Sequence, residues 1–250
     1  MVTTSNIIVL RVVSYSESSQ IATVYSEEHG KIAIIAKGAR KPKSPYAGLL
    51  QPGHLLTAIY YYKPTRSVQT LSRLEFETRA RTLYIDIEKT ALVMGLMELT
   101  SQVLQDGEVN HPVFQFVRRV LIWLDLQEEV SRLLFPYLQV RLLDLLGLGL
   151  QPMQGGPDSV PKYLNVESGT VGSGREAESS RSLSRLQGEY LQRVLCTRSS
   201  AILAANLPAS ELRQLIEHLD HYFRYHLEGI RPRRSDAIFD QILQDPVENP

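Results

Sequence analysis

The hydrophobic pattern of this chain changes near Tyr84, and the change restricts the folds that the chain can adopt. Five short runs rich in β-branched and aromatic residues precede that point, separated by turn residues, as is typical of β-strands. Beyond it, apolar residues recur every three or four positions, as on one face of an α-helix. The pattern predicts an α+β chain with its strands first and its helices second. The predicted strands cover residues 7–13, 20–25, 31–36, 55–62 and 68–76.

The spacing of these strands favours a small closed barrel. Five short strands within residues 6–81 suit the OB-fold, a five-stranded Greek-key barrel. A length of 250 residues and an apolar fraction of 43% allow a second core beside the barrel. We therefore predict an OB-fold domain over residues 1–82 and an all-α domain over residues 83–250.

Boundary residues help to place the predicted helices. Asn110 is expected to cap a helix that has Pro112 in its first turn, because an Asn side chain accepts from free backbone N–H groups there. Pro136 lies inside a Leu-rich stretch and is expected to kink or split a helix near Phe135. Gly147 is expected to end that helix. The predicted helices cover residues 85–104, 112–124, 128–146, 183–195, 199–205 and 209–227.

Residues 151–182 differ in composition from the helices on either side. They are rich in Gly and Ser and predict an irregular, partly mobile insert, with one β-hairpin near residues 163–171. The last residues, 245–250, are expected to fray.

A long stretch without carboxylates gives the strongest functional signal. Between Glu28 and Glu75 the chain has no Asp or Glu, although its overall net charge is zero. Such a stretch cannot balance its own field, so it needs a polyanion or screening by salt, and nucleic acid is a common intracellular polyanion. The stretch contains eight cations: Lys31, Lys37, Arg40, Lys41, Lys43, Lys63, Arg66 and Arg73.

Four of these cations lie in residues 37–43, which we call the basic loop. We expect Lys37, Arg40, Lys41 and Lys43 to contact phosphates, with Lys63, Arg66 and Arg73 extending the surface. Four or five such contacts predict that binding to single strands weakens with log salt at a slope of roughly −3. The alternative is a solvated surface loop. A second basic patch is proposed at Arg231, Arg233 and Arg234.

Three consecutive tyrosines lie in the fourth predicted strand. Alternation places Tyr60 and Tyr62 on one face and Tyr61 on the other. One face is expected to pack in the barrel and the other to be open for base stacking, which contributes about 1–3 kcal/mol per base. We assign Tyr60 and Tyr62 to the nucleic-acid interface, and packing of aromatic rings in the barrel is the equal alternative.

No catalytic or metal-binding motif is evident. The chain has neither a P-loop nor a Gly-x-Ser-x-Gly elbow, and its basic half lacks Asp for two-metal nuclease chemistry. Cys196 is the only cysteine, so no internal disulfide or thiolate zinc site can form. His218 and His221 share a helix face, but without further ligands we interpret them as surface or interface residues. We predict a non-enzyme that needs no cofactor or metal.

The chain shows no export or membrane signal. Its first apolar run is short and is broken by Arg11, unlike a signal peptide. No uncharged apolar stretch approaches the ~18 residues of a membrane span. We therefore expect a cytoplasmic protein.

Several motifs resemble the RecO recombination-mediator family. The N-terminal signature is specific and includes the basic loop, whereas the matches in the helical half are weaker. The resemblance covers most of the chain and is thin across residues 151–200. The matching segments are Tyr15-Ser-Glu17-Ser-Ser19, Glu28-His-Gly30-Lys31, Ala36-Lys37-Gly38-Ala39-Arg40-Lys41-Pro42-Lys43-Ser44, Leu49-Leu50-Gln51-Pro52, Tyr60-Tyr61-Tyr62-Lys63, Arg141-Leu142-Leu143-Asp144-Leu145-Leu146-Gly147 and Tyr225-His226-Leu227.

The resemblance implies a DNA-repair protein that binds single- and double-stranded DNA, anneals complementary strands and helps to load the RecA recombinase onto DNA coated by single-strand-binding protein (SSB). The implied partners are RecR and the acidic, apolar C-terminal tail of SSB. Many family members carry two Cys-x-x-Cys pairs after the Leu-Leu-Gly helix end, but residues 151–182 have no cysteine, so no zinc site is expected. We place a possible SSB-tail groove at Arg118, Arg119, Phe135, Leu138 and Arg141.

Two other functions remain open at this point. The barrel can serve as an adaptor whose basic loop binds an acidic protein or RNA, since OB-folds bind many ligands. A nuclease on an OB platform is a further alternative, which metal-dependent loss of labelled DNA would reveal. The sequence does not indicate an oligomeric state.

Overall fold

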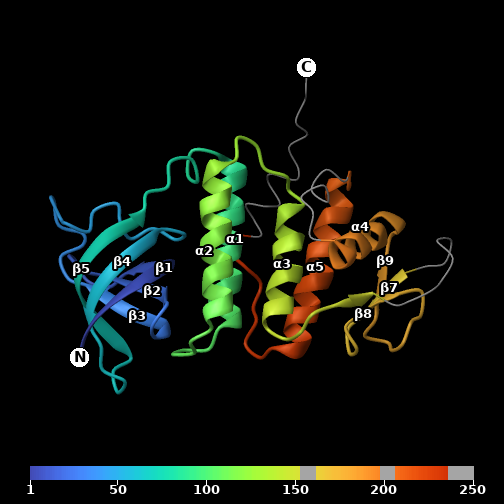
Figure 1. The fold of residues 1–250 in the computed structure, drawn as a ribbon, viewed down its shortest axis with the longest axis horizontal. Coiled ribbons are helices and arrows are strands. Elements are labelled where there is room, and N and C mark those ends of the chain that lie inside the picture. Colours follow the sequence, from blue (N-terminus) through green and yellow to red (C-terminus); the bar gives the residue numbers. More distant parts are fainter. Residues whose placement is uncertain (153–161, 198–205, 236–250) are drawn as a thin grey trace. The chain divides into compact units, whose positions relative to one another are not determined.

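The computed structural model describes residues 1–152, 162–197 and 206–235. The chain forms two compact units, residues 1–128 and residues 129–250 (Figure 1). The first unit holds the barrel and two helices, and the second holds further helices and a small sheet. The predicted helix at 199–205 and the predicted fraying end at 245–250 lie outside the described residues.

The first five strands close into a barrel with the order β1-β2-β3-β5-β4 (Figure 1). β1 pairs with both β2 and β4, which closes the ring, and β3 runs parallel to β5. This confirms the predicted OB-fold. The strands are β1 (Val2–Ser14), β2 (Gln20–Ser26), β3 (Gly30–Ala36), β4 (Leu55–Tyr61) and β5 (Val68–Thr78).

The barrel core comes from the inward-facing residues of every strand. Small and large side chains alternate there, as Ala22, Ala58 and Tyr60 illustrate, and all three are fully buried. β1 begins at Val2 rather than at the predicted residue 7. Residues 3–6 are all polar, so the alternation of apolar and polar residues that predicts a strand is not visible there. Ser5 is buried in that stretch, and its Oγ lies 3.0 Å from Ser26 Oγ on β2.

Two helices cover one side of the barrel, α1 (Ile87–Val103) and α2 (His111–Leu126). The predicted cap is confirmed, since the Asn110 side chain accepts from Val113 N at 3.1 Å and Pro112 lies in the first turn. The Tyr25 hydroxyl on β2 donates to the Asn110 carbonyl at 2.6 Å, and its ring meets Phe114 edge-on at 5.4 Å. The compact unit therefore extends beyond residue 82, where the predicted barrel domain ends.

The turn between β2 and β3 fits closely against the loop between these helices. Gly30 has φ +65°, and a Cβ there would lie 2.0 Å from the Glu108 carbonyl oxygen. Only glycine meets both conditions. Next to it, Lys31 Nζ pairs with Asp106 at 3.1 Å, and the Lys31 carbonyl accepts from Gly107 N at 2.8 Å.

The second unit begins with α3 (Leu134–Leu145). The prediction of a helix over residues 128–146 broken at Pro136 was wrong, because Pro136 lies in the first turn of α3, where its missing N–H costs nothing. Gly147, at φ +76°, ends the helix as predicted. Leu148 N donates to the Leu143 carbonyl at 2.9 Å in the pattern of a Schellman motif.

Residues 151–182 are less irregular than predicted. Their described part forms a four-stranded sheet in the order β6-β8-β7-β9, and the β7–β8 pair is the predicted hairpin. Strands of two to four residues are too short to show alternation in the sequence. The elements are β6 (Gln151–Pro152), β7 (Lys162–Asn165), β8 (Thr170–Gly172) and β9 (Arg181–Leu183), followed by α4 (Arg185–Cys196) and α5 (Ala209–His226).

Candidate nucleic-acid interface

The basic loop leaves the end of β3 and exposes its lysines. Lys37, Lys41 and Lys43 are all exposed, and none of them forms an ion pair with a described residue. Turn hydrogen bonds shape the loop, with Lys41 N donating to Gly38 O and Ser44 N donating to Lys41 O, both at 3.1 Å. The loop therefore presents three ammonium groups to solvent on a defined backbone.

Lys43 has an unusual backbone conformation. Its φ is +62°, and it is the one described non-glycine residue with positive φ. A left-handed conformation costs a non-glycine residue about 1–2 kcal/mol, and such strain is often found at functional sites. Lys43 is exposed, as are Lys37 and Lys41.

Arg40 has a different environment from the lysines around it. Its backbone N donates to Ser18 O at 3.0 Å, and its Nη1 donates to Ser16 O at 2.8 Å. These bonds tie the basic loop to the loop between β1 and β2. Arg40 therefore positions the loop, and part of its guanidinium is already engaged.

Two of the eight cations in the acid-free stretch have carboxylate partners outside it. Lys31 pairs with Asp106, and its Nζ also donates to the Ser101 carbonyl at 2.9 Å. Arg73 pairs with Glu75 two residues along β5, and both side chains are exposed. Arg73 was a predicted contact, and its charge is partly balanced in the structure.

The remaining predicted cations lie at the other end of the barrel. Lys63 and Arg66 belong to the turn between β4 and β5, which Figure 1 shows at the opposite end of the strands from the basic loop. The pairing of Ala33 with Val68 places this turn near the start of β3, whereas the basic loop follows its end. The buried Gln69 side chain orders the turn, accepting from Lys63 N at 2.9 Å and donating to Arg66 O at 2.7 Å.

A row of uncharged residues crosses the outer face of the barrel, which also carries the exposed Arg11 on β1 and Arg73 on β5. Register places Val13, Ile21, Ile35, Thr70 and Tyr61 in one row across β1, β2, β3, β5 and β4. Paired residues project from the same side of a sheet, so the row shares the outer surface. Tyr61 is 49% exposed there.

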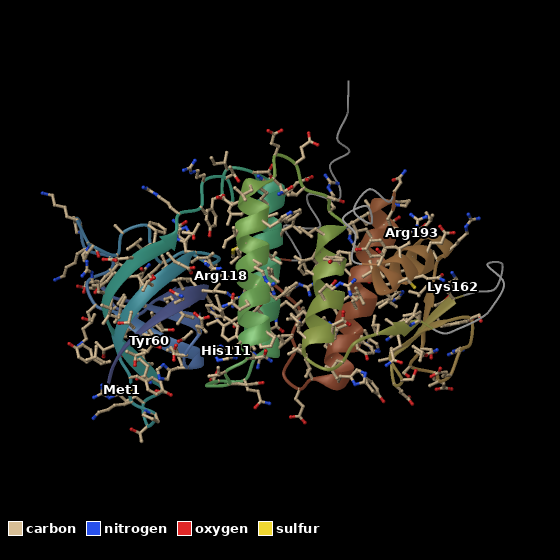
Figure 2. The ribbon with its side chains drawn as sticks, viewed as in Figure 1. Met1, Tyr60, His111, Arg118, Lys162 and Arg193 are labelled. Carbon is tan, nitrogen blue, oxygen red and sulfur yellow. The ribbon has the colours of Figure 1, made fainter. Side chains whose placement is uncertain are left out.

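The assignment of Tyr60 to base stacking was wrong. Tyr60 is fully buried among the barrel strands (Figure 2), and its hydroxyl lies 2.9 Å from Ser26 Oγ and 2.8 Å from His29 Nδ1. Tyr62 is half-buried and stacks on the His29 ring with centroids 3.6 Å apart. Burial raises the pKa of Tyr60 and lowers the pKa of His29, so both groups are neutral near pH 7. The exposed ring is Tyr61, on the face that we expected to be buried.

The residues proposed for an SSB-tail groove are engaged elsewhere, and they fall in both compact units. In the first unit, Arg118 pairs with Glu77 through two of its nitrogens, and Nε of the exposed Arg119 donates to its own helix at Gln115 O, 3.1 Å away. The Glu77 hydrogen bond raises the pKa of Arg118. Arg118 is therefore not available for a tail carboxylate without losing Glu77.

In the second unit, Phe135 and Leu138 are buried core residues of α3. Arg141 pairs with Asp144 at 2.9 Å, and its Nη2 donates to the Thr197 carbonyl at 3.1 Å. Phe135 and Leu138 are therefore not accessible to a ligand, and Arg141 already has a carboxylate partner. The proposed groove was therefore incorrect in its residues.

The second basic patch also loses a member. Arg233 is buried, donates to both carboxylate oxygens of Asp220, and lies 4.8 Å from the centroid of the Phe135 ring. Gln139 Nε2 donates to the same carboxylate at 2.7 Å. Arg233 therefore stabilises the core, while Arg231 and Arg234 are exposed.

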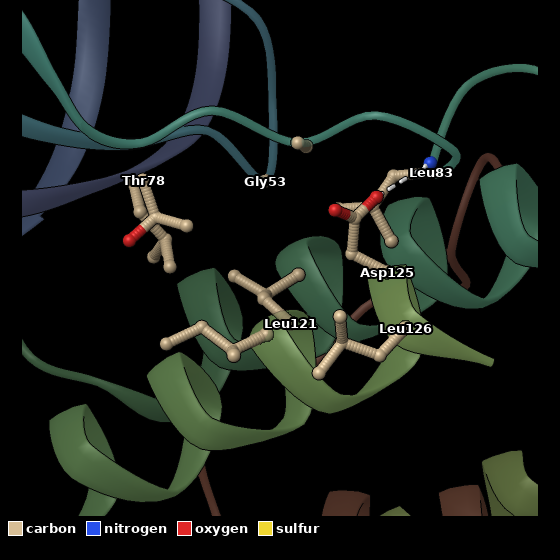
Figure 3. Close-up of a pocket in the computed structure, with 9 residues that line it drawn as sticks. Gly53, Thr78, Leu83, Leu121, Asp125 and Leu126 are labelled. Atoms are coloured by element: carbon tan, nitrogen blue, oxygen red, sulfur yellow. Dashed lines mark hydrogen bonds between the residues drawn. The ribbon is translucent and has the colours of Figure 1, made fainter.

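A cavity of about 60 Å³ lies between the barrel and α2 (Figure 3). Its walls are mostly apolar, and its charged group is Asp125, which accepts from the backbone N of Arg81, Thr82 and Leu83. Burial opposes ionisation of Asp125, but these bonds outweigh it and lower its pKa. The negative charge of Asp125 disfavours binding of the SSB tail, which ends in a carboxylate. We interpret Asp125 as a structural residue that holds the backbone of residues 81–83 against α2.

Two further findings limit the chemistry of the described residues. No helix among them is long and apolar enough to cross a membrane. Nowhere in the described ranges do three or more His, Cys, Asp or Glu side chains gather as a metal site would require.

These features define the chain as an OB-fold protein with an exposed cationic loop and a C-terminal helical region. Two family models match it, Recombination protein O N terminal over residues 1–79 and Recombination protein O C terminal over residues 85–236. The chain belongs to the RecO family of DNA repair proteins.

Curated relatives match over nearly the full length. DNA repair protein RecO of Salinibacter ruber is 28% identical over 242 residues, covering 94% of this chain and 92% of that protein. DNA repair protein RecO of an Exiguobacterium species is 28% identical over 243 residues, covering 95% of each chain. The relative from Chlorobium limicola is 27% identical over 259 residues, covering 97% of this chain and 99% of the relative.

Proposed function

We propose that this chain is a non-enzymatic DNA-binding and strand-annealing recombination mediator. One observation carries the proposal: Lys37, Lys41 and Lys43 are exposed on an OB-fold barrel with no carboxylate partner among the described residues. Their field is balanced by counterions in the free protein, and a phosphate backbone releases those ions on binding. Membership in a DNA-repair family makes DNA the expected polyanion.

The barrel face offers a path for a single strand. Cations lie at both ends of β3, at the basic loop and at Lys63 and Arg66, and the outer face of the barrel carries the uncharged row from Val13 to Tyr61 together with Arg11 and Arg73. Seven residues of strand span about 23 Å at 3.3 Å per residue, which fits the roughly 4–16 nucleotides that an OB-fold binds. Tyr61, on this outer face, is the exposed ring on which a base can stack.

Annealing then needs only electrostatics. Two single strands repel each other, and a protein that neutralises phosphates on both lowers that repulsion and raises their local concentration. No bond forms or breaks, so neither ATP nor a catalytic residue is required. The further roles, loading RecA on SSB-coated DNA and binding RecR and the SSB tail, are proposed from family membership alone.

The test compares wild type with a Lys37→Gln, Lys41→Gln, Lys43→Gln variant. Each phosphate contact contributes about −0.7 to the slope of log affinity against log salt on single strands, so the variant is expected to be shallower by about 2. The measurements are fluorescence anisotropy with a labelled single strand and annealing on SSB-coated DNA.

The matched control is Arg119→Gln, which removes an exposed charge from α2 in the same unit and is expected to leave the slope unchanged. An unchanged slope in the triple variant would refute the phosphate contacts. Tight binding to an acidic peptide, with none to oligonucleotides at low salt, would favour the adaptor, and a preference for RNA would change the substrate.

A further inference from the structure

A cluster of one arginine and two histidines lies in the other compact unit, where β9 meets α5. The Arg181 Nη2 lies 3.2 Å from Nδ1 and 3.1 Å from Nε2 of His221. No carboxylate of a described residue pairs with Arg181, which contrasts with Arg118, Arg141 and Arg233. A guanidinium has five N–H donors, and only Nη2 has a described partner here.

His218 lies one turn before His221 on the same face of α5. A hydrogen bond from its ring to the Ser182 backbone fixes the side chain against β9. Its other nitrogen, Nε2, is buried and has no hydrogen-bond partner among the described residues. His218 therefore places an unsatisfied polar atom beside the cluster, and buried polar atoms of this kind call for an explanation.

The charge of Arg181 decides which ligand suits this cluster. A metal cation beside the two histidines would face an unneutralised guanidinium, so the cluster favours an anion. The planar guanidinium matches the oxygens of a phosphate, which it can bind through two parallel hydrogen bonds.

We propose that Arg181, His218 and His221 form a binding site for a phosphate of a nucleic-acid strand, separate from the barrel. Two neighbours on α5 favour a nucleotide over an acidic peptide. Arg224 and Tyr225 lie three and four residues after His221, so they are its neighbours on the helix surface. Arg224 is exposed and adds positive charge, and Tyr225 is 50% exposed and offers a ring to the adjoining base.

The site gives binding a characteristic pH dependence. Burial is the main cause that lowers the pKa of both histidines, and Arg181 lowers both further, joined by His221 at His218 and by Arg224 at His221. A bound anion opposes this effect and favours the protonated rings. Affinity is therefore expected to rise as the pH falls below the ordinary histidine pKa of about 6.5.

The experiment follows the histidine ring signals of the full chain by NMR while sodium sulfate is added at low ionic strength. Sulfate stays doubly charged between pH 5.5 and 8, so any pH dependence reports the protein. We expect saturable shifts of the His218 and His221 signals, stronger at pH 5.5, and the same signals to move with a short single-stranded oligonucleotide. Arg181→Gln is expected to weaken sulfate binding at least about tenfold, because it removes a charged hydrogen-bond donor.

Arg193→Gln, which removes an exposed charge from α4 in the same unit, is the matched control and should bind as wild type. Arg181→Lys keeps the positive charge but loses the two parallel N–H donors of the guanidinium, so we expect sulfate affinity between those of wild type and Arg181→Gln. If Arg181→Gln does not fold, the affinity of Arg181→Lys tests the proposal instead. The proposal is overturned if sulfate leaves the rings unmoved, if sulfate binds but the oligonucleotide does not, or if an acidic peptide binds and the oligonucleotide does not. Because the readout is local to α5, such a failure leaves the proposal for the barrel standing.

Discussion

The basic loop of the barrel and two arginines outside the barrel strands, Arg118 and Arg233, use similar charges in opposite ways. Lys37, Lys41 and Lys43 face solvent without a carboxylate partner among the described residues. By contrast, Arg118 and Arg233 each hold a carboxylate and stabilise the fold. The basic loop lies in a stretch that has no carboxylate of its own, whereas Arg118 meets Glu77 from 41 residues away through tertiary packing. A wide acid-free stretch is therefore a better guide to exposed cations without a carboxylate partner than a single arginine is.

The strongest test of this contrast is Asp220→Asn. The change leaves Arg233 buried without its partner charge, which typically costs roughly 3–5 kcal/mol of unfolding free energy. Urea denaturation followed by circular dichroism measures it. Arg234→Gln, at the exposed neighbour, should change stability by less than about 0.5 kcal/mol. If the two variants are equally stable, the distinction between structural and binding cations fails for this unit.

The second test compares two adjacent tyrosines. Tyr60→Phe removes a buried hydroxyl that contacts Ser26 and His29, and we expect a loss of about 1–3 kcal/mol in stability with unchanged DNA affinity. Tyr61→Ala should leave stability nearly unchanged and weaken single-strand binding by about 1–3 kcal/mol. Urea denaturation and fluorescence anisotropy on both variants give the four values. A DNA-binding defect confined to Tyr60→Phe would reverse the assignment.

The smallest expected effect concerns a buried group that stays neutral. His54 lies in the barrel unit against Phe76 and Tyr84, and burial lowers its pKa more than its hydrogen bond to the Leu49 carbonyl raises it. The unfolded chain therefore takes up the proton first, so this contribution to stability is complete above about pH 6.5 and is lost as the pH falls below that value. Between pH 7.5 and 5.5, wild type should lose more stability than His54→Gln, by less than about 1.4 kcal/mol. Equal losses would show that His54 does not contribute.

The sequence was sufficient to predict the barrel and most helices, because their periodicity is local. It was not sufficient to predict which of the three tyrosines face the barrel interior, since three identical residues in a row do not show which side is apolar. A register shift between Ile59 and Tyr60 falls in the same place. It also failed for Arg118, whose partner Glu77 is 41 residues away. Partners of that kind are set by tertiary packing, which no motif records.

The close fit of Gly30 against Glu108 has a consequence for how this protein can be divided. A fragment that stops at residue 82 keeps every strand of the barrel but uncovers Tyr25 and leaves Lys31 without Asp106. A fragment that stops at residue 128 retains those contacts. We therefore regard α1 and α2 as part of the folding unit of the barrel, and expect the smallest fragment that folds by itself to end with α2.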